Sequence, residues 1–137
     1  MIAAGILLPP LVMAEADPRQ TTGKRGESLA RAELERRGYE IVATGFRTRY
    51  GEIDIIARDA ETLVFVEVRA RRGSDCGTAA ESVTRQKQWK VSRAAAAYLA
   101  ANGGADRPCR FDVVAIDYDL DGRPAITVYP NAFESCY

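Results

Sequence analysis

Three short runs rich in apolar and β-branched residues follow one another in the first half of the chain. They cover residues 40–47, 51–58 and 63–70 and are separated by short breaks. Runs of this length and spacing predict strands of an antiparallel meander. The third run is apolar on both faces through Val66, which is typical of a central strand covered on both sides.

A helical pattern precedes these strands. Residues 24–37 place Ala30 and Leu34 on one side, and Gly38 follows where a left-handed cap is expected. At 100° per residue, Glu27 falls on the same side as Ala30 and Leu34. We therefore expect its carboxylate to point inward.

A longer, alanine-rich helix is predicted over residues 78–101, ended by Asn102-Gly103-Gly104. Strands are predicted over residues 110–117 and 125–129. The resulting order α-β-β-β-α-β-β indicates an α/β fold, with a mixed central sheet flanked by helices in a single domain over residues 23–137.

Residues 1–22 are expected to form a disordered or weakly ordered tail. Their apolar part has no Lys or Arg before it, and Pro9-Pro10 interrupts the helix of a secretory signal, so we do not interpret it as a signal peptide. No other stretch approaches the ~20 apolar residues of a membrane span. We expect a cytoplasmic protein with no membrane partner.

Composition narrows the chemistry. The 137 residues include no histidine and three well-separated cysteines, which argues against a zinc site, a disulfide framework and a Ser-His or Cys-His nucleophile. Nineteen basic and nineteen acidic residues cancel, but residues 69–93 hold seven basic residues against two acidic ones. Such a positive centre suits a protein that engages a polyanion with one face.

Two acidic residues lie inside the most apolar runs, Asp54 in the second strand and Glu67 in the third. Burying an ionised carboxylate costs several kcal/mol, so the pair indicates a bound cation, a shared proton or a basic partner. Because residues i and i+2 of a strand share a face, Glu67 and Arg69 project side by side, and Val66 and Val68 point the other way.

With the first helix packed on the strands, the carboxylates of Glu27, Asp54 and Glu67 can converge on one point. Oxygen-only ligands select a hard cation, Mg²⁺ or Mn²⁺, which binds phosphate oxygens readily. Arg69 could hold a phosphate in a bidentate grip. This pattern predicts hydrolysis of a phosphodiester with metal assistance.

Each assignment has a structural alternative. Asp54 and Glu67 could form buried ion pairs with neighbouring basic residues and need no metal. Glu27 could simply favour the helix dipole. Asp112, at the start of a strand, is interpreted as structural, with Arg110 as its partner.

Five residues are candidates for nucleic-acid contact: Arg71, Gln86, Lys87, Lys90 and Arg93. The last four lie on the long helix, where a basic stripe either contacts phosphates or is only a solvated face. Trp89 on the same helix could belong to the core or form a stacking platform, and the core is the preferred assignment.

Five motifs occur in order between about Gly23 and Phe133. They are Gly26-Glu27, GEIDIIA at 51–57, FVEVRAR at 65–71, Ser82-Val83-Thr84 with Lys87, and RFDVV at 110–114. In this order and at these spacings, they resemble the YraN (UPF0102) family. That family is similar in turn to archaeal Holliday-junction resolvases and to the PD-(D/E)xK nuclease-like fold.

The resemblance implies a restriction-endonuclease-like core. The catalytic residues that it implies are Glu27, Asp54, Glu67 and Arg69, and the metal ligands are Glu27, Asp54, Glu67 and the backbone carbonyl of Val68. Arg69 stands where the nuclease motif has lysine. Arginine stays protonated and cannot serve as a general base, but Lys87 could supply an ammonium to the same cleft.

The implied function is that of a Mg²⁺- or Mn²⁺-dependent endonuclease that cleaves branched or flapped DNA, and a homodimer is plausible by analogy only. The alternative is a non-catalytic DNA-binding or DNA-repair accessory module. A third interpretation is a protein-interaction domain whose acidic residues Asp117, Asp119 and Asp121 meet a basic partner.

Overall fold

A computed structural model describes residues 22–72, 83–104 and 106–135. Its elements are α2 (Thr22–Arg36), β1 (Glu40–Arg47), β2 (Glu52–Asp59), β3 (Thr62–Arg72), α3 (Arg85–Ala101), β4 (Cys109–Tyr118) and β5 (Pro124–Phe133). The predicted order is confirmed. The tail expected over residues 1–22 lies outside the described residues except for Thr22, the first residue of α2.

The five strands form one sheet in the order β1-β2-β3-β4-β5. Neighbouring strands are antiparallel except for β3 and β4, which run parallel, so the meander and the mixed sheet are confirmed. β3 lies at the centre of the sheet. Its residues 63–67 are all buried, as its apolar sequence predicts.

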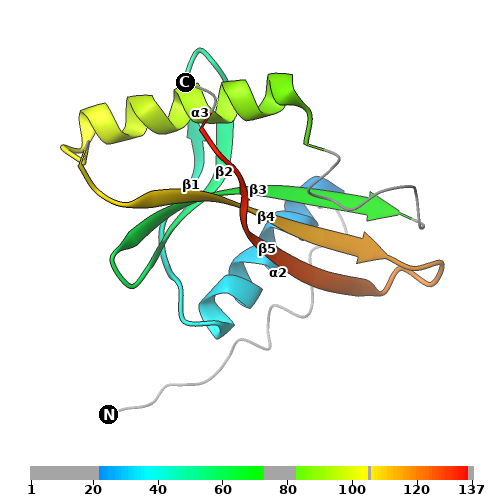
Figure 1. Cartoon of the computed structure of the whole chain (residues 1–137). Helices are drawn as coiled ribbons and strands as arrows, with labels where there is room; N and C mark the ends of the chain where they lie inside the picture. Colours follow the sequence, from blue (N-terminus) through cyan, green and yellow to red (C-terminus); the bar gives the residue numbers. More distant parts are fainter. Residues whose placement is uncertain (1–21, 73–82, 105, 136–137) are drawn as a thin grey trace, which may run out of the picture.

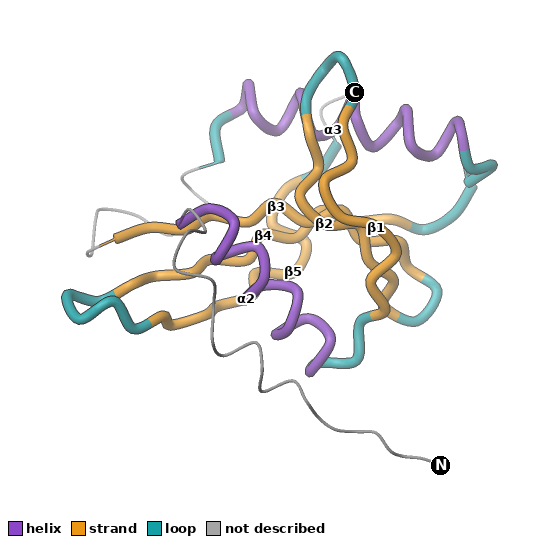
Figure 2. Tube along the Cα trace, turned by 180° about the vertical axis from the view of Figure 1, so that it is seen from behind, coloured by secondary structure: helices purple, strands orange, loops and turns teal. Residues whose placement is uncertain are grey.

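One helix covers each face of the sheet (Figure 1), and Figure 2 shows the same layers from behind. Ala30 and Leu34 of α2 pack into one buried cluster, and Val91 and Ala94 of α3 pack into another. A buried Leu or Val contributes roughly 1.5–3 kcal/mol, so these clusters hold the helices in place. Within the described ranges, neither helix is long and apolar enough to cross a membrane.

The second turn of α2 lies close to the sheet. A Cβ atom added to the buried Gly26 would lie 3.2 Å from Cβ of Ala70 on β3, so a larger residue would push the helix away. Glu27 is thereby held over the sheet. At the other end of α2, Gly38 adopts φ +95°, which confirms the predicted left-handed cap.

α3 begins later than predicted. Thr84 has an extended backbone, with φ −67° and ψ 162°, and its Oγ1 accepts a hydrogen bond of 3.1 Å from Lys87 N. A Thr N-cap of this kind fixes the first helical residue at Arg85. The prediction that residues 83–84 are helical was therefore wrong. Residues 78–82 lie outside the described ranges. Asn102 closes the helix as expected.

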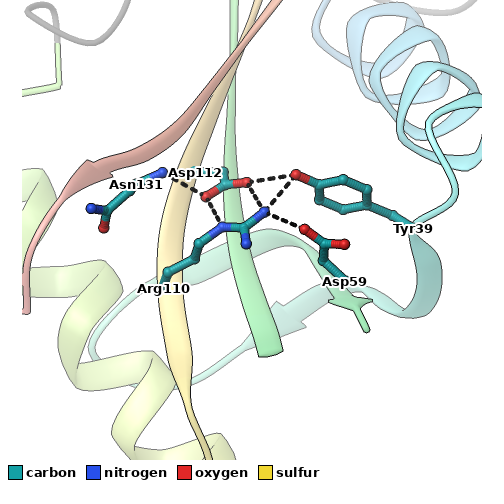
Figure 3. A network of polar contacts seen from close by, with 5 residues as sticks. All are labelled: Tyr39, Asp59, Arg110, Asp112 and Asn131. Atoms are coloured by element: carbon teal, nitrogen blue, oxygen red, sulfur yellow. Dashed lines mark hydrogen bonds and ion pairs between the residues drawn. The ribbon is translucent and has the colours of Figure 1, made fainter. Parts of the chain in front are cut away.

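Asp112 is part of a buried polar network (Figure 3). Its carboxylate accepts hydrogen bonds of 2.9 and 3.2 Å from Arg110 Nε and Nη2, and one of 2.9 Å from Asn131 N. Tyr39 Oη donates to it at 3.2 Å, and Arg110 also binds Asp59 at 3.0 Å. The predicted Asp112–Arg110 pair is confirmed.

Candidate active site

Strands β2 and β3 separate at the two predicted carboxylates. Their pairing ends at Ile55 and Val66, after which β2 continues beside β1 and β3 continues beside β4. In Figure 1 the β1–β2 hairpin turns toward α3 while β3 runs on with β4 and β5. Asp54 and Glu67 are the next residues along each strand, so both stand at the point of divergence.

Asp54 partly fills the gap between the strands. Its Oδ2 accepts a hydrogen bond of 2.8 Å from the backbone N–H of Val68. In a continuous sheet such a backbone donor is satisfied by the neighbouring strand. The side chain of Asp54 therefore replaces a backbone partner, which fixes its orientation.

Glu67 points toward α3, on the same face as Arg69. Its side chain is 4% exposed. Its Oε2 lies 3.6 Å from Lys87 Nζ and 4.0 Å from Arg69 Nη1. Val66 and Val68 pack into the cluster beneath α2, so the predicted alternation of faces is confirmed.

Two buried polar atoms at this point have no hydrogen-bond partner in the described part of the chain. They are Oε1 of Glu67 and Nε of Arg69. An unpartnered buried polar atom costs roughly 1–3 kcal/mol, and in native proteins it calls for an explanation such as a ligand or an ion. These two atoms could therefore bind a ligand or an ion.

Both carboxyl groups are hard to ionise. Burial raises the pKa of Glu67 to about 7, the charge of Asp54 adds to the rise, and Lys87 and Arg69 oppose it. Burial also raises the pKa of Asp54, although the Val68 N–H opposes this. A carboxyl group with a pKa near neutrality can gain or lose a proton at the pH of a cell.

Glu27 approaches the site from the other face of the sheet. With Asp54 it lines a pocket of about 260 Å³ beneath α2, whose other residues are Lys24, Ser28, Arg31, Thr44 and Ile55. Burial raises the pKa of Glu27, and Asp54 is the next cause. The inward position predicted for Glu27 is therefore observed.

The three carboxylates do not converge on one point. Among residues 22–72, 83–104 and 106–135, no three acidic, cysteine or histidine side chains are grouped so as to hold a metal ion. Asp54 influences both of the other acids, but Glu27 lies beneath α2 and Glu67 faces α3. The sequence pattern did not reveal that the two acids approach Asp54 from the sides of different helices.

Basic residues gather beside Glu67. A second pocket, of about 270 Å³, is lined by Arg69, Thr84, Gln86, Lys87 and Lys90. It brings together three of the five residues predicted to contact a nucleic acid. The pocket also contains Thr84, which was not among the residues predicted to contact a nucleic acid. Its position just before the basic helix was the signal that could have identified it.

The other two residues predicted to contact a nucleic acid, Arg71 and Arg93, do not line this pocket. Arg71 forms an ion pair of 2.9 Å with Asp117 on β4. Arg93 lies over the ring of Tyr50, with its Cζ 4.2 Å from the ring centroid.

Trp89 is 42% exposed, so its assignment to the core was wrong. α3 turns its alanines, rather than its indole, toward the sheet.

Comparison with known proteins places the chain in a family. The model of the family described as "Uncharacterised protein family UPF0102" matches residues 26–116. This chain belongs to the UPF0102 family. The match contains Asp54, Glu67 and Lys87, so the strand divergence and its basic partner lie inside the family's characteristic region.

Relatives in the UPF0102 family match over nearly their full length. A UPF0102 protein of Symbiobacterium thermophilum is 47% identical over 113 residues, which cover 82% of this chain and 96% of the relative. One of Geobacter sulfurreducens is 49% identical over 115 residues, covering 84% and 90%. One of Nocardia farcinica is 45% identical over 115 residues, covering 84% and 91%.

The resemblance to a nuclease-like fold would imply a divalent metal, and the donor chemistry at the divergence fits one in part. Asp54 and Glu67 offer hard oxygen donors, and Oε1 of Glu67 has no protein partner among the described residues. Glu27 does not complete the set in the described arrangement. Lys87 and Arg69 instead form the ion pairs of the structural alternative.

Proposed function

We propose that this UPF0102 protein is a Mg²⁺- or Mn²⁺-dependent DNA endonuclease that hydrolyses phosphodiester bonds in branched or flapped DNA. The observation that carries the proposal is the pair of buried carboxylates where β2 and β3 separate, with an unpartnered Glu67 oxygen beside a basic pocket. Folding alone does not call for two such groups side by side.

Asp54 and Glu67, with the backbone carbonyl of Val68, would hold the metal, and Glu27 stands on the far side of Asp54. When bound, the ion supplies positive charge that activates water and stabilises charge on the phosphodiester. The Val68 N–H keeps Asp54 in place through its 2.8 Å hydrogen bond.

Two basic side chains have distinct roles in this proposal. Arg69 holds the phosphate, because its guanidinium stays charged and can bind two oxygens at once. Lys87 lies 3.6 Å from Glu67, so its ammonium is a second positive charge beside the carboxylate that would hold the metal, next to the phosphate.

The basic pocket supports DNA as the partner. Gln86, Lys87 and Lys90 project from one helix beside Arg69, in reach of successive phosphates of one strand. The preference for branched or flapped DNA rests on the resemblance to junction resolvases, as does a homodimer. A cytoplasmic location is part of the same proposal.

The test is cleavage of labelled branched, flapped, single-stranded and linear DNA with Mn²⁺ or Mg²⁺. Glu67→Gln keeps the shape of the side chain and removes its charge, and Glu61→Gln is the matched control because Glu61 is exposed. We expect metal-dependent cutting by the wild type and by Glu61→Gln, with a loss of about a hundredfold or more in Glu67→Gln, because a neutral amide holds a divalent ion less well than a carboxylate and the ion supplies several kcal/mol of charge stabilisation. Equal cutting by all three would remove Glu67 from the mechanism.

A second candidate function is a non-catalytic DNA-binding module. The observation that favours it is the pairing of Glu67 with both Lys87 and Arg69, which neutralises the carboxylate without a metal. This module would bind DNA with an affinity that falls steeply with salt, and no protein variant would cut it. Salt-sensitive binding without cleavage would therefore select this candidate over the endonuclease.

A further inference from the structure

An aromatic cluster lies where the β1–β2 turn meets α3, and its Trp89 is exposed while its Tyr50 is half-buried. The rings of Tyr50 and Trp89 meet edge to face, with centroids 6.2 Å apart. Arg93 lies over both, with its Cζ 4.2 Å from the centroid of Tyr50 and 5.3 Å from that of Trp89. Arg49 adds a further cation 5.1 Å from the centroid of Tyr50.

The local backbone holds this cluster in place. Thr48 N donates to Gly51 O at 2.8 Å, and Tyr50 N donates to Thr48 Oγ1 at 3.0 Å, which closes the turn. Gly51 lies against α3, since a Cβ atom there would be 3.2 Å from Cβ of Lys90. The rings are therefore presented by two elements in contact rather than by a loose loop.

Trp89 is not needed for the core. Its side chain is 42% exposed, whereas Val91, Ala94 and Ala95 make the buried contacts of α3 with the sheet. Tryptophan is highly buried on average, and an exposed indole beside a second ring and a cation is a candidate contact for a partner. Its surroundings indicate which kind of partner that is.

The charges around the cluster select an anion. Every charged residue of α3 is basic: Arg85, Lys87, Lys90 and Arg93. Lys87 and Lys90 also line the pocket beside Glu67, so the rings and the candidate active site lie along one helix. Aromatic faces beside a run of cations are how proteins bind single-stranded nucleic acid, in which bases are free to stack.

We propose that the exposed indole of Trp89, braced by Tyr50 and Arg93, is a stacking site for an unpaired base, and that Lys87 and Lys90 hold the neighbouring phosphates. The proposal rests on the proposed DNA function and names its substrate feature: a single-stranded segment beside the bond to be cut. A flap or branch presents such a segment, whereas a blunt duplex does not.

Trp89 is the only tryptophan of the chain, so its intrinsic fluorescence reports on this site directly. We expect an oligothymidine of about eight nucleotides to quench it saturably, with weaker binding as salt rises. A blunt duplex at the same phosphate concentration should quench much less. Unchanged fluorescence with saturating oligothymidine would overturn the proposal.

Binding of labelled oligothymidine by anisotropy provides the second measurement. Trp89→Leu should weaken binding about tenfold, the typical effect of one lost stack, while Trp89→Phe should retain most of it. Leu120→Ala is the matched control, because Leu120 is 97% exposed in the β4–β5 turn. Equal affinity of wild type and Trp89→Leu, with both proteins folded by circular dichroism, would contradict the stacking site.

The two proposals fail in different ways. Quenching without any cleavage would keep the stacking site and reject the nuclease. Cleavage of branched DNA with no quenching, and with normal activity of Trp89→Leu, would keep the nuclease and reject the stacking site.

Discussion

Two buried carboxylates on neighbouring strands are treated very differently by this fold. Asp112 of β4 is fully buried, and Glu67 of β3 is 4% exposed. Both oxygens of Asp112 accept hydrogen bonds, from Arg110, Tyr39 and Asn131 (Figure 3). Glu67 has two ion-pair partners at 3.6 and 4.0 Å on one oxygen, and its other oxygen has none in the described chain.

The difference separates a structural group from a candidate functional one. Burying a charge is tolerated when every acceptor position is filled, as it is for Asp112. Glu67 keeps unmet bonding capacity, and burial together with the nearby charge of Asp54 raises its pKa. Burial alone therefore does not mark a site, whereas burial without full compensation does.

The same isosteric change should have very different effects in the two places. Asp112→Asn removes the charge from a fully formed network and leaves Arg110 without its main partner, so we expect a loss of about 3–5 kcal/mol. Glu67→Gln removes a poorly stabilised charge, so the variant should be at least as stable as the wild type at neutral pH. Urea unfolding of both variants measures this, and equal losses would remove the distinction.

The pH dependence of stability sharpens the comparison at Glu67. Its pKa is raised from 4.5 to about 7 in the folded protein, so the protonated form is favoured by folding. This contribution is fully present below pH 4.5 and is lost as the pH rises through about 7. Without divalent metal, the stability of wild type relative to Glu67→Gln should fall by a few kcal/mol across that window.

Thermal unfolding of both proteins at a series of pH values, with a chelator present, would check this trend. A difference between them that stays constant from pH 4 to pH 8 would show that Glu67 titrates as it does in the unfolded chain.

Exchanging arginine for lysine tests the geometry of the two regions. Arg110 uses its guanidinium fork to reach Asp112, Tyr39 and Asp59, which an ammonium cannot reproduce. Arg110→Lys should cost about 1–2 kcal/mol, as expected for lost charge-assisted bonds. Arg69→Lys should cost less than about 0.5 kcal/mol, because its only ion pair in the described chain is 4.0 Å long. Calorimetry of both variants measures the two losses of stability. A larger loss in Arg69→Lys than in Arg110→Lys would contradict this prediction.

Metal binding should also have a small effect on stability. At about ten times the dissociation constant, Mn²⁺ should stabilise the wild type by about 1.4 kcal/mol through binding to the folded state. Asp54→Asn should lose this gain, and Asp106→Asn, a change at an exposed residue, should keep it. A melting temperature that Mn²⁺ raises equally in all three proteins would place the ion elsewhere.

Much of the fold could be read from the sequence because its signals are local. Strand β1 begins and ends where its residue pattern predicts, and Gly38 caps α2 as expected. The start of α3 was misjudged because the preceding alanines favour a helix, whereas the hydroxyl of Thr84 fixes its first turn. The nearness of Glu67 to Arg69 was also predictable, since it follows from the two-residue repeat of a strand.

The candidate site was decided by tertiary structure. The sequence shows acids at positions 27, 54 and 67, but not that β2 leaves β3 at Ile55 and Val66, nor that Glu27 and Glu67 approach Asp54 from the sides of different helices. Trp89 likewise looked like core until packing assigned that role to alanines. Residue patterns determine elements because neighbours along the chain act locally. Where strands separate, and which carboxylate finds partners, depends on contacts between residues far apart in sequence.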